Sequence, residues 1–142
     1  MMNPKHKKLN AQTTIQKLKP LEEKEKSFIL LSFKFCDSKI GFRKFQLKQL
    51  PNFIRDISNL TNKTWDEAIK LPRQTNLGYE QIHFQKNRFS EPLPQGFAED
   101  IKLDVFRICN QKARLIGKKS AKEPSLFYVF WVDFDLCVYD HG

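Results

Sequence analysis

The chain has 142 residues and is 40% hydrophobic, enough for one domain with a sizeable core, and its 25 lysines and arginines against 16 aspartates and glutamates give a net charge of +9. Three widely spaced cysteines without a CxxC motif argue against a disulfide framework or a zinc site and fit a cytoplasmic location. The longest apolar run, Leu126 to Val132, is far too short to cross a membrane. The charge favours RNA, DNA or an acidic protein as partner, although it can also serve solubility alone.

The first 26 residues differ in composition from the rest of the chain. Met1 to Lys26 contains seven lysines, three glutamates and only scattered apolar residues, so we expect a flexible basic arm. Such an arm can neutralise phosphates, dock on a partner or be no more than an irregular terminus. Residues 27–142 are predicted to form a single domain.

One strand and two helices are predicted in the first half of this domain. Phe28 to Cys36 alternates apolar and polar residues, with a buried face expected at Ile29, Leu31, Phe33 and Phe35. Leu50 to Leu60 is predicted to be a helix, because a proline suits its first turn and its apolar residues form one stripe. Thr64 and Glu67 form a capping box that opens a second, shorter helix, which Pro72 ends.

Strands dominate the second half of the chain. Tyr79 to Gln85 alternates like a strand, and two amphipathic strands are expected around Arg107 and Arg114. Both alternating faces of the last strand are apolar, which predicts a central strand covered on both sides, with faces Phe127, Val129, Trp131 and Tyr128, Phe130, Val132. The predicted fold is therefore α+β: two helices packed on one face of a mostly antiparallel sheet of four to five strands.

No Walker loop, dinucleotide fingerprint, GxSxG or HExxH motif is present, so no cofactor is predicted and any catalysis depends on scattered residues. His83 is a candidate general base, or alternatively a half-buried strand histidine. Asp133 and Asp135 would share a face in a strand and could hold Mg²⁺, but aspartates at this position favour a turn instead. No metal site is therefore predicted.

Two arginines lie inside predicted strands. Arg107 and Arg114 flank a turn and are expected to approach each other across a hairpin. Guanidinium groups suit phosphate because their donors match two of its oxygens. Alternatively, each arginine pairs with a carboxylate at the rim of the sheet. Four more cations would extend the arginines into a nucleic-acid-binding patch: Arg88, Lys112, Lys118 and Lys119.

The segments LSFKFCD, IHFQ with EPLPQGF, FRICNQKARLIG, and FYVFWVD with VY resemble a family of small uncharacterised prokaryotic proteins that end in a Trp-Leu-Asp-Pro-x-His-x-Leu-Tyr pattern. Trp131, Asp133 and Tyr139 match that ending. Phe134 replaces its proline and Leu136 its histidine, so a catalytic role of that histidine does not carry over.

The order and size of the elements also resemble, more distantly, the RelE/ParE-like toxins, several of which cut mRNA on the ribosome without a metal ion. This resemblance implies a cytoplasmic endoribonuclease that contacts RNA or the ribosome and is covered by an acidic antitoxin. Arg107 and Arg114 would bind the scissile phosphate, and His83 or Tyr139 would move protons. The alternative is a non-catalytic module, encoded by a mobile element, that binds nucleic acid or a protein.

Overall fold

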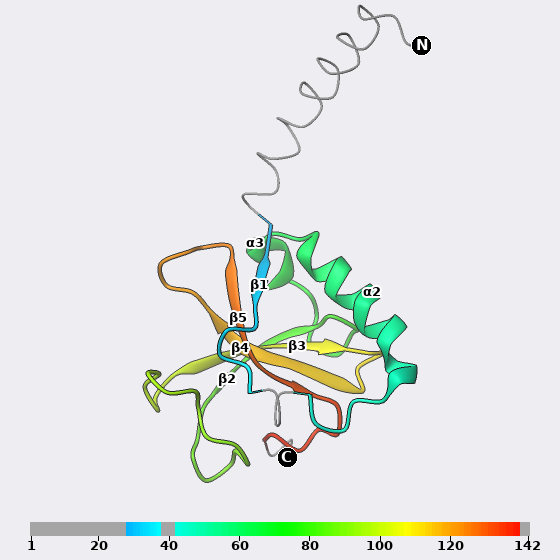
Figure 1. Ribbon diagram of the computed structural model, residues 1–142. Coiled ribbons are helices and arrows are strands. Elements are labelled where there is room, and N and C mark those ends of the chain that lie inside the picture. The colour runs from blue at the N-terminus through cyan, green and yellow to red at the C-terminus, as the bar shows by residue number, and fades with distance from the viewer. Residues whose placement is uncertain (1–27, 38–41, 140–142) are drawn as a thin grey trace, which may run out of the picture.

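The computed structural model describes residues 28–37 and 42–139, and the predicted basic arm lies outside the described residues. One main helix and a short one pack on an open five-stranded sheet, which confirms the α+β prediction (Figure 1). The sheet order is β1-β5-β4-β3-β2, in which β1 is parallel to β5 and every other pair is antiparallel. The elements are β1 (Leu30–Ser32), η1 (Leu47–Gln49), α2 (Leu50–Thr61), α3 (Trp65–Ala68), β2 (Tyr79–His83), β3 (Lys102–Ile108), β4 (Ala113–Lys119) and β5 (Leu126–Asp133).

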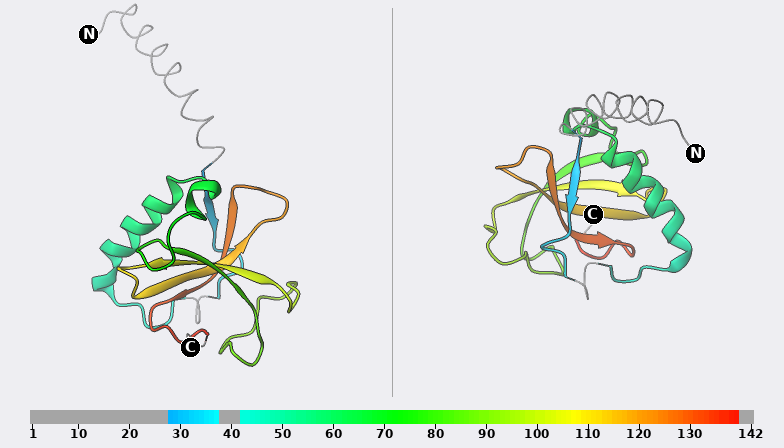
Figure 2. Two further views of the ribbon diagram at one scale, coloured as in Figure 1. Left: turned by 180° about the vertical axis from the view of Figure 1, so that it is seen from behind. Right: turned by 45° about the horizontal axis from the view of Figure 1, so that its top comes forward.

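Both faces of the sheet are covered. The helices α2 and α3 lie on one face, whereas the long connection from β2 to β3 and the segment after β5 lie on the other (Figures 1 and 2). A core cluster under the helices includes Phe53, Trp65, Phe106 and Phe127. A second cluster on the opposite face joins Leu103, Ile116 and Trp131 to residues of the connection and the C-terminal segment, among them Phe84, Phe97 and Val138. No helix among the described residues is long and apolar enough to cross a membrane.

The first strand is shorter than predicted. It ends at Ser32, and a turn follows in which the Cys36 N–H donates to the Phe33 carbonyl over 3.0 Å. The predicted alternation therefore fails from Phe33 onward, and that side chain is 42% exposed. Phe35 crosses to the far face of the sheet, where its ring contacts the rings of Phe97 and Tyr128.

The two helices begin where the sequence predicts. Helix α2 carries Pro51 in its first turn. The predicted capping box of α3 is present, because the Glu67 N–H donates to the Thr64 hydroxyl and the Thr64 N–H donates to the Glu67 carboxylate. Helix α3 is only four residues long, since the chain turns back after Ala68 and the Leu71 carbonyl accepts the N–H of Tyr79 at the start of β2.

A bulge in β5 overturns the predicted assignment of its faces. Ile116 pairs with Trp131 and Gly117 pairs with Val129, so Phe130 is the extra residue. Phe130 and Trp131 consequently lie in the same core cluster, and Val132 joins Phe127 and Val129 on the helix side. A Cβ atom on Gly117 would lie 1.9 Å from the Tyr128 carbonyl oxygen, so only glycine fits beside the bulge.

Strands β3 and β4 are also less amphipathic than predicted. Leu103 to Phe106 and Ala113 to Gly117 are buried throughout, because the connection between β2 and β3 covers the face that was expected to meet solvent. β5 lies inside the sheet and is covered on both faces as predicted, but β4 is the middle strand. The charged residues of this hairpin therefore lie mainly at its two ends, with Arg107 and Arg114 next to the turn and Lys102, Lys118 and Lys119 at the opposite end.

The arginine end of this hairpin is shaped by a turn of three consecutive left-handed residues, Cys109, Asn110 and Gln111, with φ values of 54°, 57° and 66°. Asp56 of α2 is fully buried, and its carboxylate accepts the Cys109 N–H over 2.6 Å and the Asn76 amide over 2.9 Å. The Asn76 side chain in turn accepts the Gln111 N–H over 3.3 Å. Non-glycine residues in this conformation cost about 1–3 kcal/mol each, so the turn depends on these bonds.

Replacing Asp56 by alanine is therefore expected to lower the free energy of unfolding by about 3 kcal/mol, because the buried Cys109 N–H loses its acceptor. Urea denaturation measures the change. The control is Asp66→Ala, at the exposed first turn of α3, for which a loss below about 1 kcal/mol is expected. Equal losses in the two variants would show that the turn does not depend on Asp56.

Candidate anion-binding site at the end of the sheet

The structure brings Arg107 and Arg114 together as predicted. They are directly opposite each other on β3 and β4, so their side chains lie on the same face with Cβ atoms about 5 Å apart. This is the face turned away from the helices, at the end of the hairpin next to the left-handed turn. Arg114 is buried, with 6% of its surface exposed, and Arg107 is half-buried.

Gln111 orients both guanidinium groups. Its carbonyl oxygen accepts from Arg114 Nη1 over 2.7 Å, and its side-chain oxygen accepts from Arg107 Nη1 over 3.3 Å. Arg114 Nη1 also donates to the Ala113 carbonyl over 3.1 Å. The Nε atoms of both arginines are buried, and neither has a hydrogen-bond partner among residues 28–37 and 42–139. Each arginine therefore carries a donor that the described part of the chain leaves unsatisfied.

The described residues provide no ion pair for either arginine. Across residues 28–37 and 42–139, no carboxylate oxygen lies within 4.0 Å of either guanidinium, whereas Arg43, Arg55 and Arg73 all have such partners. The alternative prediction, that each strand arginine pairs with a carboxylate at the sheet rim, is therefore wrong for this part of the chain. Two adjacent cations without a direct ion pair to the described residues favour an anionic ligand.

Tyr139 joins this site from the C-terminal segment. Its hydroxyl donates to the Glu80 carboxylate over 3.3 Å and is hydrogen-bonded to Arg114, and its ring stacks on Phe89. Burial, and then the nearby charge of Glu80, raise the pKa of Tyr139 to about 12, although Arg114 opposes the shift. The phenol is thus protonated at neutral pH and acts as a hydrogen-bond donor rather than a base.

The carboxylates nearest to the arginines have other partners. Glu80 accepts from Arg73 Nε over 3.2 Å. Asp133 is opposite Arg114 in the β4–β5 pairing, but its carboxylate accepts the N–H groups of Cys137 and Val138 over 3.2 and 3.0 Å. Asp133 is thus the last residue of β5 and not part of the predicted hairpin turn, although its carboxylate does bind the backbone of the bend that follows, and burial raises its pKa. Three guanidinium groups (Arg73, Arg107, Arg114) against two carboxylates leave a surplus of one positive charge.

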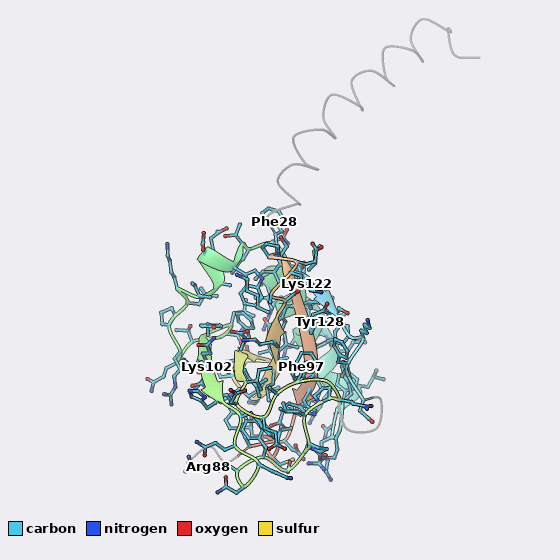
Figure 3. The ribbon with its side chains drawn as sticks, turned by 90° about the vertical axis from the view of Figure 1, so that its left-hand side faces the viewer. Phe28, Arg88, Phe97, Lys102, Lys122 and Tyr128 are labelled. Atoms are coloured by element: carbon cyan, nitrogen blue, oxygen red, sulfur yellow. The ribbon has the colours of Figure 1, made fainter. Side chains whose placement is uncertain are left out.

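His83 lies at the opposite end of the β2–β3 pairing from the arginines, because its partner Lys102 comes five residues before Arg107 on β3, about 16 Å along the strand. It is the exposed last residue of β2, where it is paired with Lys102. His83, Arg88 and Tyr139 line one open depression of about 300 Å³, together with Ile82, Gln85 and Phe89. Figure 3 shows the loop of Arg88, whose side chain extends toward solvent. Tyr139 is the residue shared by the depression and the arginine pair.

The other predicted phosphate contacts are dispersed. Lys118 and Lys119 lie at the far end of β4 from Arg114, where Lys118 Nζ donates to the Lys102 carbonyl and Lys119 Nζ lies over the Trp65 ring. Lys112 lines a separate cavity beside α2. The structure therefore does not gather the four cations into one patch with the arginines.

Sequence reasoning missed two residues of the site. Glu80 binds Tyr139, and Gln111 holds both arginines, yet neither belongs to a motif. The only sequence signal for Gln111 is its place in the predicted turn between the two strands. Its role depends on the left-handed conformation, which composition does not reveal.

A possible metal-binding group lies behind this end of the sheet. One ligand atom each from Asp133, Asp135 and Cys137 falls within 4.8 Å of the others. All three already have protein partners: the Cys137 thiol donates to Asp135 over 2.8 Å and accepts from the Arg43 guanidinium. Burial, and then the bond to Asp135, raise the pKa of the Cys137 thiol, which disfavours the thiolate that a metal prefers.

Comparisons with known proteins do not assign this chain to a family. The chain matches no family model, no curated protein and no solved structure. Its fold and site define a small α+β protein with a largely buried pair of neighbouring arginines at one end of its sheet.

A titration tests the environment of Tyr139. Its ordinary pKa of 10.0 is raised to about 12, so the stabilisation from this phenol is present below pH 10 and is lost as the pH rises through 12. We expect Tyr139→Phe to remove one of the tyrosine ionisations that the folded protein shows above pH 10 when its tyrosinate absorbance is followed against pH. The late ionisation of Tyr79, whose pKa is also raised by burial, serves as the internal reference. Loss of a step near pH 10 instead would contradict the assignment.

Proposed function

We propose that this protein binds the phosphate backbone of RNA through Arg107 and Arg114. The observation that carries the proposal is the pair of neighbouring guanidinium groups without carboxylate partners in the described part of the chain, each with a buried Nε that bonds nothing. Because both Nε atoms are buried, a phosphate would bind the outer guanidinium nitrogens of Arg107, the more exposed of the two arginines, through charge-assisted hydrogen bonds.

The surroundings of the arginine pair favour single-stranded RNA. Phe89 and Tyr139 present stacked, half-buried aromatic rings beside Arg88 in the adjoining depression. Aromatic rings next to cations suit unpaired bases, which stack on them while the cations bind the backbone. The net charge of +9 supports the same choice of partner, because it attracts any polyanion before contacts form.

Replacing Arg107 by glutamine is expected to weaken binding to single-stranded RNA about tenfold and to reduce the slope of log K against log salt by about 0.7, the value for one phosphate contact. Fluorescence anisotropy over a range of salt concentrations measures both. Lys122→Gln, an exposed charge in the β4–β5 loop, is the matched control and should leave the affinity within twofold. Equal effects of the two variants would mean that net charge alone attracts RNA.

A catalytic role like that of the RelE-like toxins is a second candidate, favoured by the depression that His83, Arg88 and Tyr139 share. In this mechanism the His83 imidazole takes the proton of a ribose 2′-hydroxyl, and the oxygen attacks phosphorus. The bond from phosphorus to the 5′-oxygen breaks, and Tyr139 gives its proton to that leaving oxygen. The products are a 2′,3′-cyclic phosphate and a 5′-hydroxyl. Arg88, which lines the same depression, stabilises the charge on the phosphoryl oxygens without a metal ion, and Arg107 and Arg114 hold a neighbouring part of the RNA chain.

A ribonuclease of this kind would act on mRNA, with the ribosome as a further contact. Its activity would harm the cell that makes it, so an acidic antitoxin that covers the exposed cations is part of the proposal. The discovery of a small acidic reading frame beside this gene would support it. Without catalysis, the same surface serves a binding module, the alternative function.

His83→Gln is expected to reduce RNA cleavage at least about 100-fold, because it removes the base, while RNA affinity stays within twofold. Gel analysis of end-labelled RNA without added metal measures cleavage, and growth on induction measures toxicity. Gln85→Ala, in the same depression but unable to move protons, is the control and should cleave normally. If the unaltered protein binds RNA but yields no products and arrests no growth, the binding module is correct and the ribonuclease is not.

A further inference from the structure

A second basic cavity lies on the other side of the turn that holds the arginine pair. It has a volume of about 500 Å³ beside η1 and the start of α2. Three lysines line it: Lys44 precedes η1, Lys48 lies within η1, and Lys112 follows the β3–β4 turn. Side-chain amides, including those of Gln46, Asn52 and Asn110, line it as well.

The lysines of this cavity have no close counter-charge in the part of the chain that the structure describes. Within residues 28–37 and 42–139, none of its three lysines has a carboxylate within 4.0 Å. Asp135, the one carboxylate among the lining residues, already accepts from the Cys137 thiol and lies 4.0 Å from Arg43. The first turns of η1 and α2 also contain no acidic residue, in contrast to Asp66 and Glu67 in α3. Lysines, amide donors and the start of a helix all favour an anion.

The cavity and the arginine pair share the left-handed turn. Cys109 and Asn110 line the cavity, and the next residue, Gln111, binds Arg107 and Arg114. Asp56 fixes this turn against α2, so the two basic sites are held in one rigid arrangement. A ligand with a single phosphate would fill one site, whereas a chain of phosphates can follow the turn from one to the other.

We propose that this cavity, lined by Lys44, Lys48 and Lys112, is a second contact site for the phosphate backbone of the same single-stranded RNA. The identity of the ligand rests on the proposed function. The new element is the path of the RNA, which would run from the arginine pair around the turn to this cavity. Binding here lengthens the footprint and leaves the contacts at the arginine pair unchanged.

The test compares two fluorescently labelled oligouridines, one of about four nucleotides and one of about sixteen, the range of site sizes for single-strand-binding domains. The variant Lys44→Gln/Lys48→Gln/Lys112→Gln is expected to bind the longer RNA at least about tenfold more weakly, with its salt slope reduced by about 2 for three lost contacts. Affinity for the short RNA should stay within twofold. All three lysines are exposed, so the variant should fold normally, which circular dichroism checks.

A variant with the same loss of charge is the control: Lys70→Gln/Lys86→Gln/Lys122→Gln, at exposed positions outside both sites. It should bind both RNAs normally, and an equal weakening of the longer RNA would overturn the proposal. Preferential binding of inorganic triphosphate, lost with the cavity lysines, would assign the cavity to a small anion instead.

The outcomes also separate this proposal from the proposed function. If Arg107→Gln weakens both RNAs and the cavity variant weakens neither, the cavity proposal fails and RNA binding at the arginine pair stands. If Arg107→Gln weakens neither RNA and the cavity variant weakens the longer one, RNA binding belongs to the cavity and the arginine site fails.

Discussion

The structure at this end of the sheet depends on one buried carboxylate. Asp56 extends from α2 under the β3–β4 turn and accepts the N–H of Cys109, so the helix layer and the strand layer are joined at a point where the backbone is strained. Through Asn76 the same network holds the Gln111 N–H. The positions of both arginines, and the separation of the two basic sites, follow from the conformation of that turn.

The covering of both sheet faces decides where a ligand can bind. Helices bury one face and the β2–β3 connection buries most of the other, so the strands meet solvent mainly at their ends (Figure 2). Arg107 and Arg114 lie where this cover ends, close to Tyr139 and the depression beside β2. A polyanion would therefore run across the end of the sheet. The flat face, which β-sheet nucleic-acid-binding proteins often use, is filled with apolar side chains.

Much of the framework was predictable because it depends on local rules. The apolar stripe and proline of α2, the Thr64–Glu67 capping box and the hairpin that pairs Arg107 with Arg114 are all encoded within a few residues of chain. The early end of β1 was not predictable, because the alternation of apolar and polar residues continues past Ser32. The chain nevertheless turns there, and Phe35 packs in the core cluster on the other face of the sheet. The bulge at Phe130 was hidden for a similar reason, because a run of apolar residues looks the same with or without it.

The α+β class, the helix starts, the basic charge and the two arginines in strands follow from the amino-acid sequence. Which cations lie side by side depends on the packing of the elements: Lys118 and Lys119 lie at the opposite end of β4, and Lys112 lies across the turn from the arginines. The packing also decided that these arginines lack carboxylate partners in the described part of the chain and that Tyr139 joins them. The physical reason is that hydrogen-bonding patterns within an element are local. Charge pairing and burial instead depend on contacts between segments far apart in the chain.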